Sequence, residues 1–371
     1  MILHIITTTD VGGTEMMLEK LITNSVSDEE HLVISLTSVG KIGDRLLSKG
    51  IQVQPMHLDG ISDFPRCVKD INNVIKKYKP NLIQTWLYHS DFIGAILGLY
   101  NRIPVVWNIR QTKFAKTSPL STLVIMRLCV IISYFVPKKI ICAAYASAKS
   151  HVRFGYDKKK ILVIPNGFDD KFANYDLQST RLLKERYSIH DTDLIVGIVG
   201  RFHPDKDHLN FVNSSMLVAR SIENSKFLMV GRNLDTENDV LMGWIKSVGL
   251  EDRYILLGEQ TDISSLLALM DVFCLSSLSE GFPNVLGEAM LMERPCVSTE
   301  CGDAEQIIGD CGVLVKVNDS FRLSAAIIKL LNLSSEERKA IGIKARSRIL
   351  EKFSLIKTVN SYLLLYKKLK K

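Results

Sequence analysis

The feature that most constrains the fold is an alternation of strand-like and helix-like segments that restarts near residue 191. In the first half, apolar runs such as "ILHII" and "NLIQTW" alternate with amphipathic stretches such as "PRCVKDINNVIKKYKP". The second half repeats the pattern with "DLIVGIVG", "KFLMVGR" and "DVFCLSS". Short apolar runs separated by helix-length segments are typical of buried parallel strands. We therefore expect two α/β domains, each doubly wound around a parallel sheet.

The length of 371 residues also favours two domains, because it exceeds what one ordinary core accommodates. Residues 166–190 are polar and irregular, which suits a linker. We place the N-terminal domain at residues 1–165 and the C-terminal domain at residues 191–353. The final helical segment breaks near Phe353 and Ser354, and we expect a helix over 354–371 to pack back on the first domain.

The net charge of +7 is unevenly distributed along the chain. Residues 1–164 hold 21 Lys/Arg against 12 Asp/Glu, whereas residues 165–371 hold 26 against 28. An excess of +9 on one half predicts an anionic ligand or surface there, with a solvated basic face as the alternative. The seven cysteines form no CxxC pair, and the start "MILHIITTTDVGG" lacks a basic leader and a cleavage site. We therefore expect a cytoplasmic protein without zinc or disulfides.

The longest apolar segment, "PLSTLVIMRLCVIISYFVPKK" at residues 119–139, approaches the length of a membrane span. Arg127 lies at its centre and prolines bracket it, which disfavours a transmembrane helix. We expect a buried helix of the first domain. The alternative is a helix on the membrane surface, with Lys138 and Lys139 at the lipid headgroups.

Two loops after predicted strands have features of anion binding. In the first domain, "TTTDVGGTEMMLEKL" places Gly12 and Gly13 between a strand and a helix, where the backbone can approach a ligand and the helix N-terminus favours an anion. This is not the GxGxxG of a nicotinamide site. In the second domain, "VGRFHPDKDH" places Arg201 and Lys206 on one loop, and two cations there suit a diphosphate.

The stretch "SLSEGFPNVLGEAM" contains two glutamates, Glu280 and Glu288, after the strand "DVFCL". Pro283 suits the first turn of a helix, so Glu280 should lie in the preceding loop and Glu288 within the helix. Eight helical residues span roughly 12 Å, whereas a carboxylate pair acting on one glycosidic bond needs roughly 5–9.5 Å. We interpret the glutamates as two contacts on one elongated ligand, with backbone amides of residues 282–286 facing an anion between them.

Several motifs together resemble one enzyme family. "EGFPNVLGE" resembles the E-x7-E motif of family 4 glycosyltransferases, which are retaining enzymes of the GT-B fold, and "GRFHPDK" is similar to their phosphate loop. "DVGGTE", "VIPNGFD" and "CGDAEQI" resemble further family segments, while "QTWLYHSDFIGAILG" and "PVVWNIRQT" resemble members that build bacterial surface polysaccharides. The resemblance covers nearly the whole chain. It implies two Rossmann-like domains facing each other across a cleft, the first binding the acceptor and the second the nucleotide-sugar donor.

The resemblance also implies roles for individual residues. Arg201 and Lys206 should neutralise the donor diphosphate, Glu280 should bind hydroxyls of the transferred sugar, and Glu288 should bind the ribose. Donor contacts are further implied at Gly12, Gly13, Gly281, Phe282, Pro283, Asn284, Val285 and Leu286, and acceptor or sugar contacts at Glu15, His89, Arg110 and Gln111. Many relatives have a histidine where this chain has Gln111, which can form hydrogen bonds but cannot titrate. No metal or other cofactor is implied, because the cations and a helix N-terminus would stabilise the leaving diphosphate.

The function expected on this basis is that of a retaining glycosyltransferase on the inner face of the bacterial cytoplasmic membrane. The donor would be a nucleotide-sugar, a UDP-sugar in preference to a GDP-sugar, and the acceptor a lipid-linked oligosaccharide for O-antigen, capsule or lipopolysaccharide. The basic N-terminal domain would bind an anionic membrane surface, and no nucleic-acid partner is expected. The alternatives are a nucleotide-sugar 2-epimerase of the same fold and a non-catalytic protein that binds sugar nucleotides or lipids.

Overall fold

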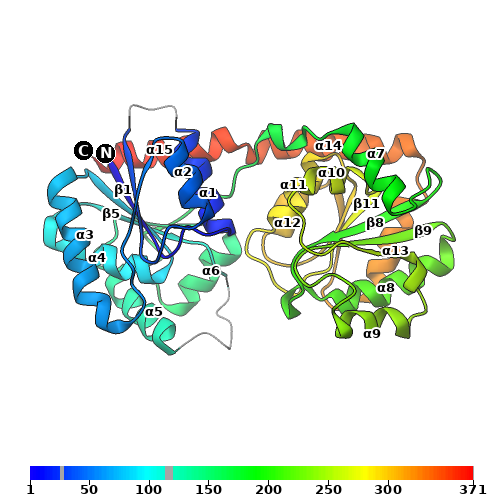
Figure 1. Ribbon diagram of the computed structural model, residues 1–371, viewed down its shortest axis with the longest axis horizontal. Coiled ribbons are helices and arrows are strands. Elements are labelled where there is room, and N and C mark those ends of the chain that lie inside the picture. Colours follow the sequence, from blue (N-terminus) through cyan, green and yellow to red (C-terminus); the bar gives the residue numbers. More distant parts are fainter. Residues whose placement is uncertain (26–28, 113–119, 371) are drawn as a thin grey trace. The chain divides into compact units, whose positions relative to one another are not determined.

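The computed structural model describes residues 1–25, 29–112 and 120–370. The chain forms two compact units (Figure 1): unit 1 consists of Met1–Gly167 and Leu355–Lys371, and unit 2 of Phe168–Ser354. Each unit is a parallel sheet with helices on both faces, which confirms the two α/β domains predicted from the strand–helix alternation. None of the described helices is both long enough and apolar enough to cross a membrane.

The sheet of unit 1 has the strand order β3-β2-β1-β4-β5-β6-β7, and all its pairings are parallel. Its strands are β1 (Ile2–Ile6), β2 (His31–Ser35), β3 (Gln52–Pro55), β4 (Leu82–Trp86), β5 (Val105–Ile109), β6 (Lys139–Cys142) and β7 (Ile161–Val163). Successive side chains of β1 face opposite sides, as the twofold periodicity of a strand requires. Leu3 and Ile5 join the apolar cluster on one face of the sheet, and Ile2 and Ile6 the cluster on the other.

The helices of unit 1 cover these two faces (Figure 1). The side of Leu3 carries α3 (Phe64–Tyr78), α4 (Tyr88–Asn101), α5 (Leu120–Ser133) and α6 (Tyr145–Phe154). The side of Ile2 carries α1 (Gly13–Thr23), α2 (Lys41–Ser48) and α15 (Leu355–Leu369). A short 3-10 turn, η1 (Ile61–Asp63), precedes α3. The last helix of the chain, α15, thus completes the first unit, with Val359 and Tyr362 buried against the sheet.

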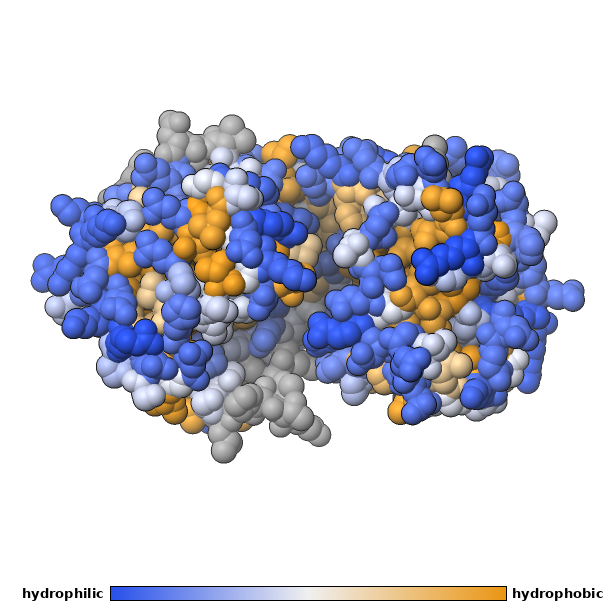
Figure 2. Space-filling model, viewed as in Figure 1, coloured by the Kyte–Doolittle hydropathy of each residue, from blue (hydrophilic) through white to orange (hydrophobic). Residues whose placement is uncertain are grey.

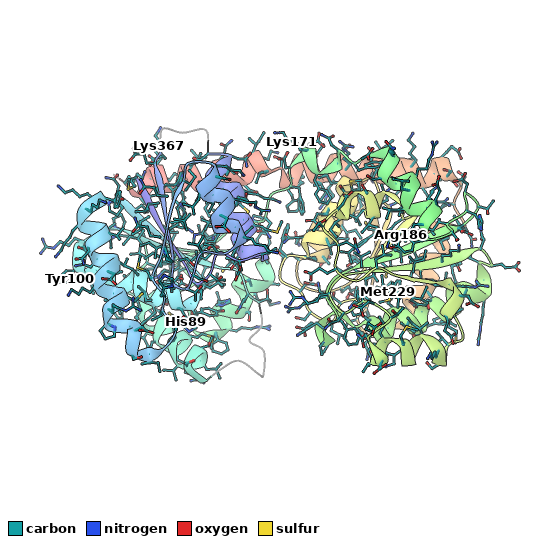
Figure 3. All side chains as sticks on the ribbon, viewed as in Figure 1. His89, Tyr100, Lys171, Arg186, Met229 and Lys367 are labelled. Carbon is teal, nitrogen blue, oxygen red and sulfur yellow. The ribbon has the colours of Figure 1, made fainter. Side chains whose placement is uncertain are left out.

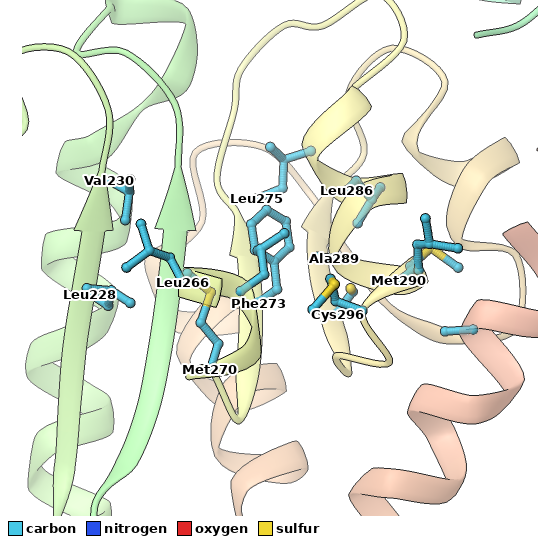
Figure 4. Close-up of a cluster of buried hydrophobic side chains, with 14 of the residues drawn as sticks. Leu228, Val230, Leu266, Met270, Phe273, Leu275, Leu286, Ala289, Met290 and Cys296 are labelled. Carbon is cyan, nitrogen blue, oxygen red and sulfur yellow. The ribbon is translucent and has the colours of Figure 1, made fainter. Parts of the chain in front are cut away.

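The sheet of unit 2 has the order β10-β9-β8-β11-β12-β13 and is also wholly parallel. Its strands are β8 (Leu194–Val199), β9 (Ser225–Val230), β10 (Tyr254–Leu256), β11 (Val272–Leu275), β12 (Cys296–Thr299) and β13 (Gly312–Val315). One face is covered by α10 (Ile263–Ala268), α11 (Asn284–Leu291), α12 (Ala304–Ile308) and α14 (Ser335–Phe353), and the other by α8 (His208–Ser221), α9 (Asp239–Ser247) and α13 (Ser320–Leu331). Figure 4 shows the first of these cores, in which Phe273 of β11 and Leu286 of α11 are fully buried. Three 3-10 turns complete the unit: η2 (Asp170–Ala173), η3 (Pro204–Lys206) and η4 (Glu251–Arg253).

The expectation of an irregular linker over residues 166–190 is wrong in one respect. Helix α7 occupies Leu177–Arg186 and contacts α10 of unit 2. Asp176 caps its N-terminus by accepting hydrogen bonds from two backbone amides, and Leu183 packs against the core of unit 2. The polar composition of the segment reflects the exposed face of a surface helix, which the sequence pattern did not reveal.

Helix α5 occupies residues 120–133 of the apolar segment singled out above, and its burial differs from the expectation. Met126 and Cys129 are buried against the sheet at 1% and 0% exposure, but Val124 and Ile131 are 59% and 61% exposed. The helix is therefore neither wholly buried nor a membrane span. One apolar face of the helix packs on the sheet and another is exposed. Because both faces are apolar, the composition of the segment does not show which side chains are buried.

Candidate functional site

The candidate donor site of unit 2 lies where its strand order changes direction. Strands β8 and β11 are neighbours in the sheet, and the connections that follow them run to opposite sides. In such sheets ligands bind beyond the carboxyl ends of the strands at this switch point. The loop after β8 carries Arg201 and Lys206, and the loop after β11 carries Glu280. The two loops singled out from the sequence are thus brought to one place.

Lys206 and Glu280 form an ion pair at this switch point. The Lys206 Nζ lies 2.6 Å from Glu280 Oε1, and the two side chains are 22% and 14% exposed. The hydroxyl of Ser277 donates to the same carboxylate oxygen at 2.7 Å. The loops themselves are joined, since the Leu278 amide donates to the Asp205 carbonyl at 2.8 Å. The pair is therefore held in a fixed, partly dehydrated position.

Arg201 lies exposed on the same loop and forms no ion pair within the described residues. Its backbone carbonyl is held by the buried His208, whose Nε2 lies 3.1 Å away. Burial lowers the pKa of His208 to about 4, so the imidazole is neutral at pH 7 and acts as a structural donor. The guanidinium of Arg201 is thus available to an anion, while its main chain is fixed.

Glycines pack closely against the backbone of the loops that follow β8 and β11. A Cβ at Gly231 would lie 2.1 Å from the Gly200 carbonyl, and the φ of Gly231 is +143°. Gly302, at φ +55°, approaches the Gly281 carbonyl, where a Cβ would lie at 2.4 Å. Only glycine fits both the left-handed backbone and the close approach.

The helix after Glu280 is α11, which begins at Asn284. Pro283 is its N-cap, whereas the prediction placed this proline in the first turn, so the helix begins one residue later than predicted. Glu280 accordingly lies in the loop, and Glu288 lies within the helix, as predicted from the proline. The rings of Phe282 and Phe168 stack at 6.0 Å. Hence a ligand at the start of α11 would meet main-chain amides, because the first turn of a helix leaves its amides without intrahelical acceptors.

The side chains in this segment mostly face the protein core. Leu286 is fully buried and Val285 packs against the same cluster. A Cβ at Gly287 would lie 2.1 Å from the ring of Phe168. Of the residues implied as donor contacts, Leu286 can therefore contribute only through its backbone, whereas Phe282 and Val285 are partly buried.

The glycine loop of unit 1 leads into α1, with Gly12 at its N-cap and Gly13 as its first residue. Glu15 folds back over this end, since a Cβ at Gly12 would lie 2.3 Å from Glu15 Oε2. Glu15 is 7% exposed. Burial raises the pKa of its carboxyl, while the nearby Arg110 guanidinium opposes the shift. Glu15 and Arg110, both implied as acceptor or sugar contacts, therefore lie close together.

Arg110 is held by residues that the sequence analysis did not single out. Its guanidinium donates to the side-chain oxygen of Asn166, and Tyr362 of α15 interacts with it. Asn108 on β5 donates to the Tyr362 hydroxyl at 3.0 Å. Asn166 belongs to the Asn-Gly turn quoted above, but no sequence signal linked Tyr362, about 250 residues away, to this position.

The other two contacts implied for unit 1 are Gln111, which directly follows Arg110 in the chain, and His89. Gln111 is exposed, and its backbone carbonyl accepts a hydrogen bond from Ser147 at 2.7 Å. His89 lies in the first turn of α4, whereas Tyr100 lies near the other end of this helix (Figure 3). Burial lowers the pKa of His89. This histidine lines an apolar cavity of unit 1.

Comparison with known proteins agrees with these features. The family model for glycosyltransferase family 4 matches residues 11–172, and that for glycosyl transferases group 1 matches residues 193–333. The chain is 26% identical over 317 residues to the Escherichia coli UDP-Gal:alpha-D-GlcNAc-diphosphoundecaprenol alpha-1,3-galactosyltransferase, covering 81% of this chain and 80% of the relative. It is 25% identical over 284 residues to the capsular polysaccharide biosynthesis glycosyltransferase CapM of Staphylococcus aureus, covering 75% and 74%.

Solved structures show the same fold. The crystal structure of Anabaena HepE in complex with UDP has a TM-score of 0.85, 21% sequence identity and 99% coverage of both chains. WaaG, a glycosyltransferase involved in lipopolysaccharide biosynthesis, has a TM-score of 0.71, 13% identity and 98% coverage of both chains. The two family models together span most of the chain, and the chain therefore belongs to the family 4 glycosyltransferases of the GT-B fold.

Proposed function

We propose that the protein is a retaining glycosyltransferase that moves a sugar from a UDP-sugar to a lipid-linked oligosaccharide in the synthesis of a bacterial surface polysaccharide. The observation that carries this proposal is the ion pair of Lys206 and Glu280 at the switch point of unit 2. It joins the phosphate loop to the first glutamate of the E-x7-E motif. The exposed cation of Arg201 lies on the same loop, so two positive charges serve one anion.

In the proposed reaction, the bond between the sugar anomeric carbon and the diphosphate oxygen breaks, and the acceptor oxygen bonds to that carbon from the same face. The acceptor proton passes to the departing diphosphate. Arg201, Lys206 and the first amides of α11 stabilise the negative charge that develops there. Glu280 holds the sugar hydroxyls and Glu288 the ribose. Because these groups supply the positive charge, we expect activity to persist in EDTA.

The choice of donor and acceptor is supported by relatives. The E. coli relative is named for UDP-Gal and for an acceptor on diphosphoundecaprenol. A Campylobacter jejuni relative, 26% identical over 216 residues, is likewise named for a diphospho-undecaprenol acceptor. The HepE structure contains UDP. We therefore favour UDP over GDP in the donor and a polyprenyl diphosphate in the acceptor.

We further propose that unit 1 binds the inner face of the cytoplasmic membrane through the outer face of α5. Val124, Leu128, Ile131 and Phe135 follow one another along this face and its end, and are 40–80% exposed. Figure 2 shows apolar side chains at several places on a surface that is otherwise mostly hydrophilic. An exposed apolar row of this kind indicates an interaction surface.

The charges around α5 favour an anionic bilayer as its partner. Residues 120–160 contain eight Lys/Arg and one Asp/Glu, a net charge of +7. Arg127 and Arg153 lie beside Ile131 around one shallow pocket. Lys160 donates to the Tyr134 carbonyl at 2.8 Å, which places the turn of three consecutive lysines, residues 158–160, next to the end of α5. None of these eight cations forms an ion pair within the part of the chain that the structure describes. Basic residues near a membrane surface each contribute about 1 kcal/mol to binding of anionic lipid.

A nucleotide-release assay tests the enzymatic part of the proposal. UDP- and GDP-sugars are screened with and without a polyprenyl-diphosphate-linked saccharide, and release of UDP that depends on the acceptor is expected. Arg201→Ala and Glu280→Ala should each lower turnover at least about 100-fold. Sugar interconversion without acceptor would identify a 2-epimerase, and ligand binding without any turnover would identify a binding protein.

Vesicle co-sedimentation tests the membrane part. The wild-type protein should bind vesicles with anionic lipid more strongly than neutral vesicles, and Ile131→Glu should weaken this binding. Ile343→Glu is the matched control, because Ile343 is 48% exposed on α14 of unit 2. Equal binding to anionic and neutral vesicles would contradict the assignment.

A further inference from the structure

Unit 1 contains an apolar cavity of about 870 Å³ at the carboxyl ends of its strands. Thr7 follows β1, Leu36 and Thr37 follow β2, and Leu58 follows β3. Helix α4 contributes His89 and Phe92, and α5 contributes Val124 and Ile125. Ligands of parallel α/β sheets bind at this edge, and the volume is within the range of small-molecule sites. No residue of the donor site in unit 2 lines this cavity.

The walls of the cavity are fixed by bonds between the segments that follow the strands. The Leu58 amide donates to the Leu36 carbonyl at 2.8 Å, and the Thr37 amide donates to the Thr7 carbonyl at 3.1 Å. Phe64 and Phe92 pack with their ring centroids 6.1 Å apart and together form one side. These contacts join three strand ends to α3 and α4, so the cavity is part of the folded unit.

The chemistry of the lining selects an uncharged, elongated apolar ligand. Most lining side chains are aliphatic or aromatic, and Asp59 is the one carboxylate among them. Among the described residues, no lysine or arginine lines the cavity, and burial favours the neutral form of His89 by lowering its pKa. A phosphate or a nucleotide would find no cation among these described lining residues, whereas a hydrocarbon chain would remove the apolar walls from water.

The cavity is continuous with the outer face of α5. Val124 lines the cavity and is also the first exposed apolar residue of the row that continues through Leu128 and Ile131. Along this row, Arg127 and Arg153 lie beside Ile131, and Lys160 donates to the Tyr134 carbonyl near its end. A chain that left a bilayer at the basic end would thus meet apolar side chains along α5 as far as the cavity.

We infer that this cavity binds the part of the acceptor's polyprenyl chain nearest its diphosphate. The inference rests on the proposed lipid-linked acceptor and adds a chain-binding site to it. His89, on the cavity wall, would then lie near the junction of hydrocarbon and headgroup. The enzyme would recognise its acceptor by the lipid as well as by the sugar.

Photocrosslinking tests the site without relying on turnover. The full-length protein is irradiated with a polyprenyl phosphate that carries a diazirine in its first isoprene units, and the labelled peptides are identified by mass spectrometry. We expect labels on cavity residues of α4, α5 and the 58–64 segment, reduced by excess unlabelled polyprenyl phosphate. Labels elsewhere only, or equal competition by phospholipid, would overturn the inference.

A variant pair links the cavity to acceptor choice. Ile61 is 88% exposed at the cavity wall, so Ile61→Asp places a charge there without disturbing the core. Leu99→Asp is the control, since Leu99 is 70% exposed on α4 but does not line the cavity. Ile61→Asp should raise the KM for a polyprenyl-linked acceptor about tenfold, leave the kcat and the KM for the same saccharide diphosphate without isoprene units unchanged, and reduce crosslinking.

The outcomes separate this inference from the proposed function. If transfer to lipid-linked acceptors occurs but the preference for polyprenyl-linked over isoprene-free acceptors is the same in Ile61→Asp and wild type, the cavity assignment is wrong and the function stands. If no lipid-linked acceptor supports transfer but polyprenyl phosphate still labels the cavity, the proposed reaction is wrong and the lipid site stands.

Discussion

Replacing Lys206 by methionine is the most direct test of the site in unit 2. The substitution keeps much of the side-chain volume but removes the charge that lies 2.6 Å from Glu280. Loss of one of two cations that stabilise a departing diphosphate should lower kcat at least about 100-fold, equivalent to about 2.7 kcal/mol of transition-state stabilisation.

The effect on folding should be smaller, and this difference makes the test informative. The pair is only partly buried, and Glu280 retains the hydrogen bond from Ser277. The free energy of unfolding should therefore fall by about 1–2 kcal/mol. For a domain of about 5 kcal/mol stability, this leaves about 1% of the molecules unfolded or fewer, far too few to account for a 100-fold loss of activity.

The assay combines nucleotide-release kinetics with urea denaturation of the same preparations. Lys344→Met is the matched control: Lys344 pairs with Asp310 at 2.7 Å in the same unit, but at an exposed position away from the site. Glu280→Gln and the double variant complete a cycle, and their losses should be less than additive if the pair acts as one unit. A kcat for Lys206→Met within threefold of wild type would refute the proposed role of this cation.

Three further predictions concern folding. The neutral form of the buried His208 is favoured in the native state because its pKa is lowered to about 4, so this histidine alone contributes a fall of about 3 kcal/mol in the free energy of unfolding as the pH drops from 6.5 towards 4. His208→Gln should remove this contribution in pH-dependent urea titrations and leave those of the other histidines with lowered pKa values, His4, His31, His89 and His151. Gly243 lies inside α9 with open space around it, so Gly243→Ala should stabilise unit 2 by about 0.5–1 kcal/mol, whereas Gly287→Ala, which meets the ring of Phe168, should destabilise it; equal shifts would contradict the packing. Because burial raises the pKa of Glu15, its ionisation weakens the native state as the pH rises above 4.5; Glu15→Gln should therefore be more stable than wild type at pH 7 and no more stable at pH 4.

The strands and the division into two α/β units could be predicted from the sequence because buried parallel strands are continuous apolar runs. "ILHII" and "LIVGIV" coincide with β1 and β8. Helix α7 was missed because its core contacts are few, and most of its side chains are polar and lie at the surface. Local pattern is therefore sufficient for strands buried on both faces and for helices with a regular apolar face such as α3, and insufficient for a surface helix with few core contacts.

The ion pair of Lys206 and Glu280 could not be predicted from local sequence, although both residues were singled out as candidates. Their contact depends on β8 lying next to β11, an order that the spacing of strands along the chain does not specify. Tyr362 shows the same limit more strongly, because its contact with Asn108 requires the last helix to return to unit 1. A side chain that positions a site residue from a distant segment has no recognisable motif in the sequence around it.

The two apolar faces of α5 have different physical consequences. The inner face, with Met126 and Cys129, stabilises unit 1 by leaving water on folding. The outer face cannot contribute in this way, since Ile131 and Phe135 remain 61% and 80% exposed in the folded chain. A membrane would let the outer face leave water as well, and the uncompensated +7 of residues 120–160 would favour an anionic one. Val124 belongs both to this outer face and to the cavity. Contact between the outer face and a membrane would therefore bring a membrane-embedded lipid chain to the carboxyl edge of the sheet. The same surface would then serve both for membrane binding and for selection of the acceptor.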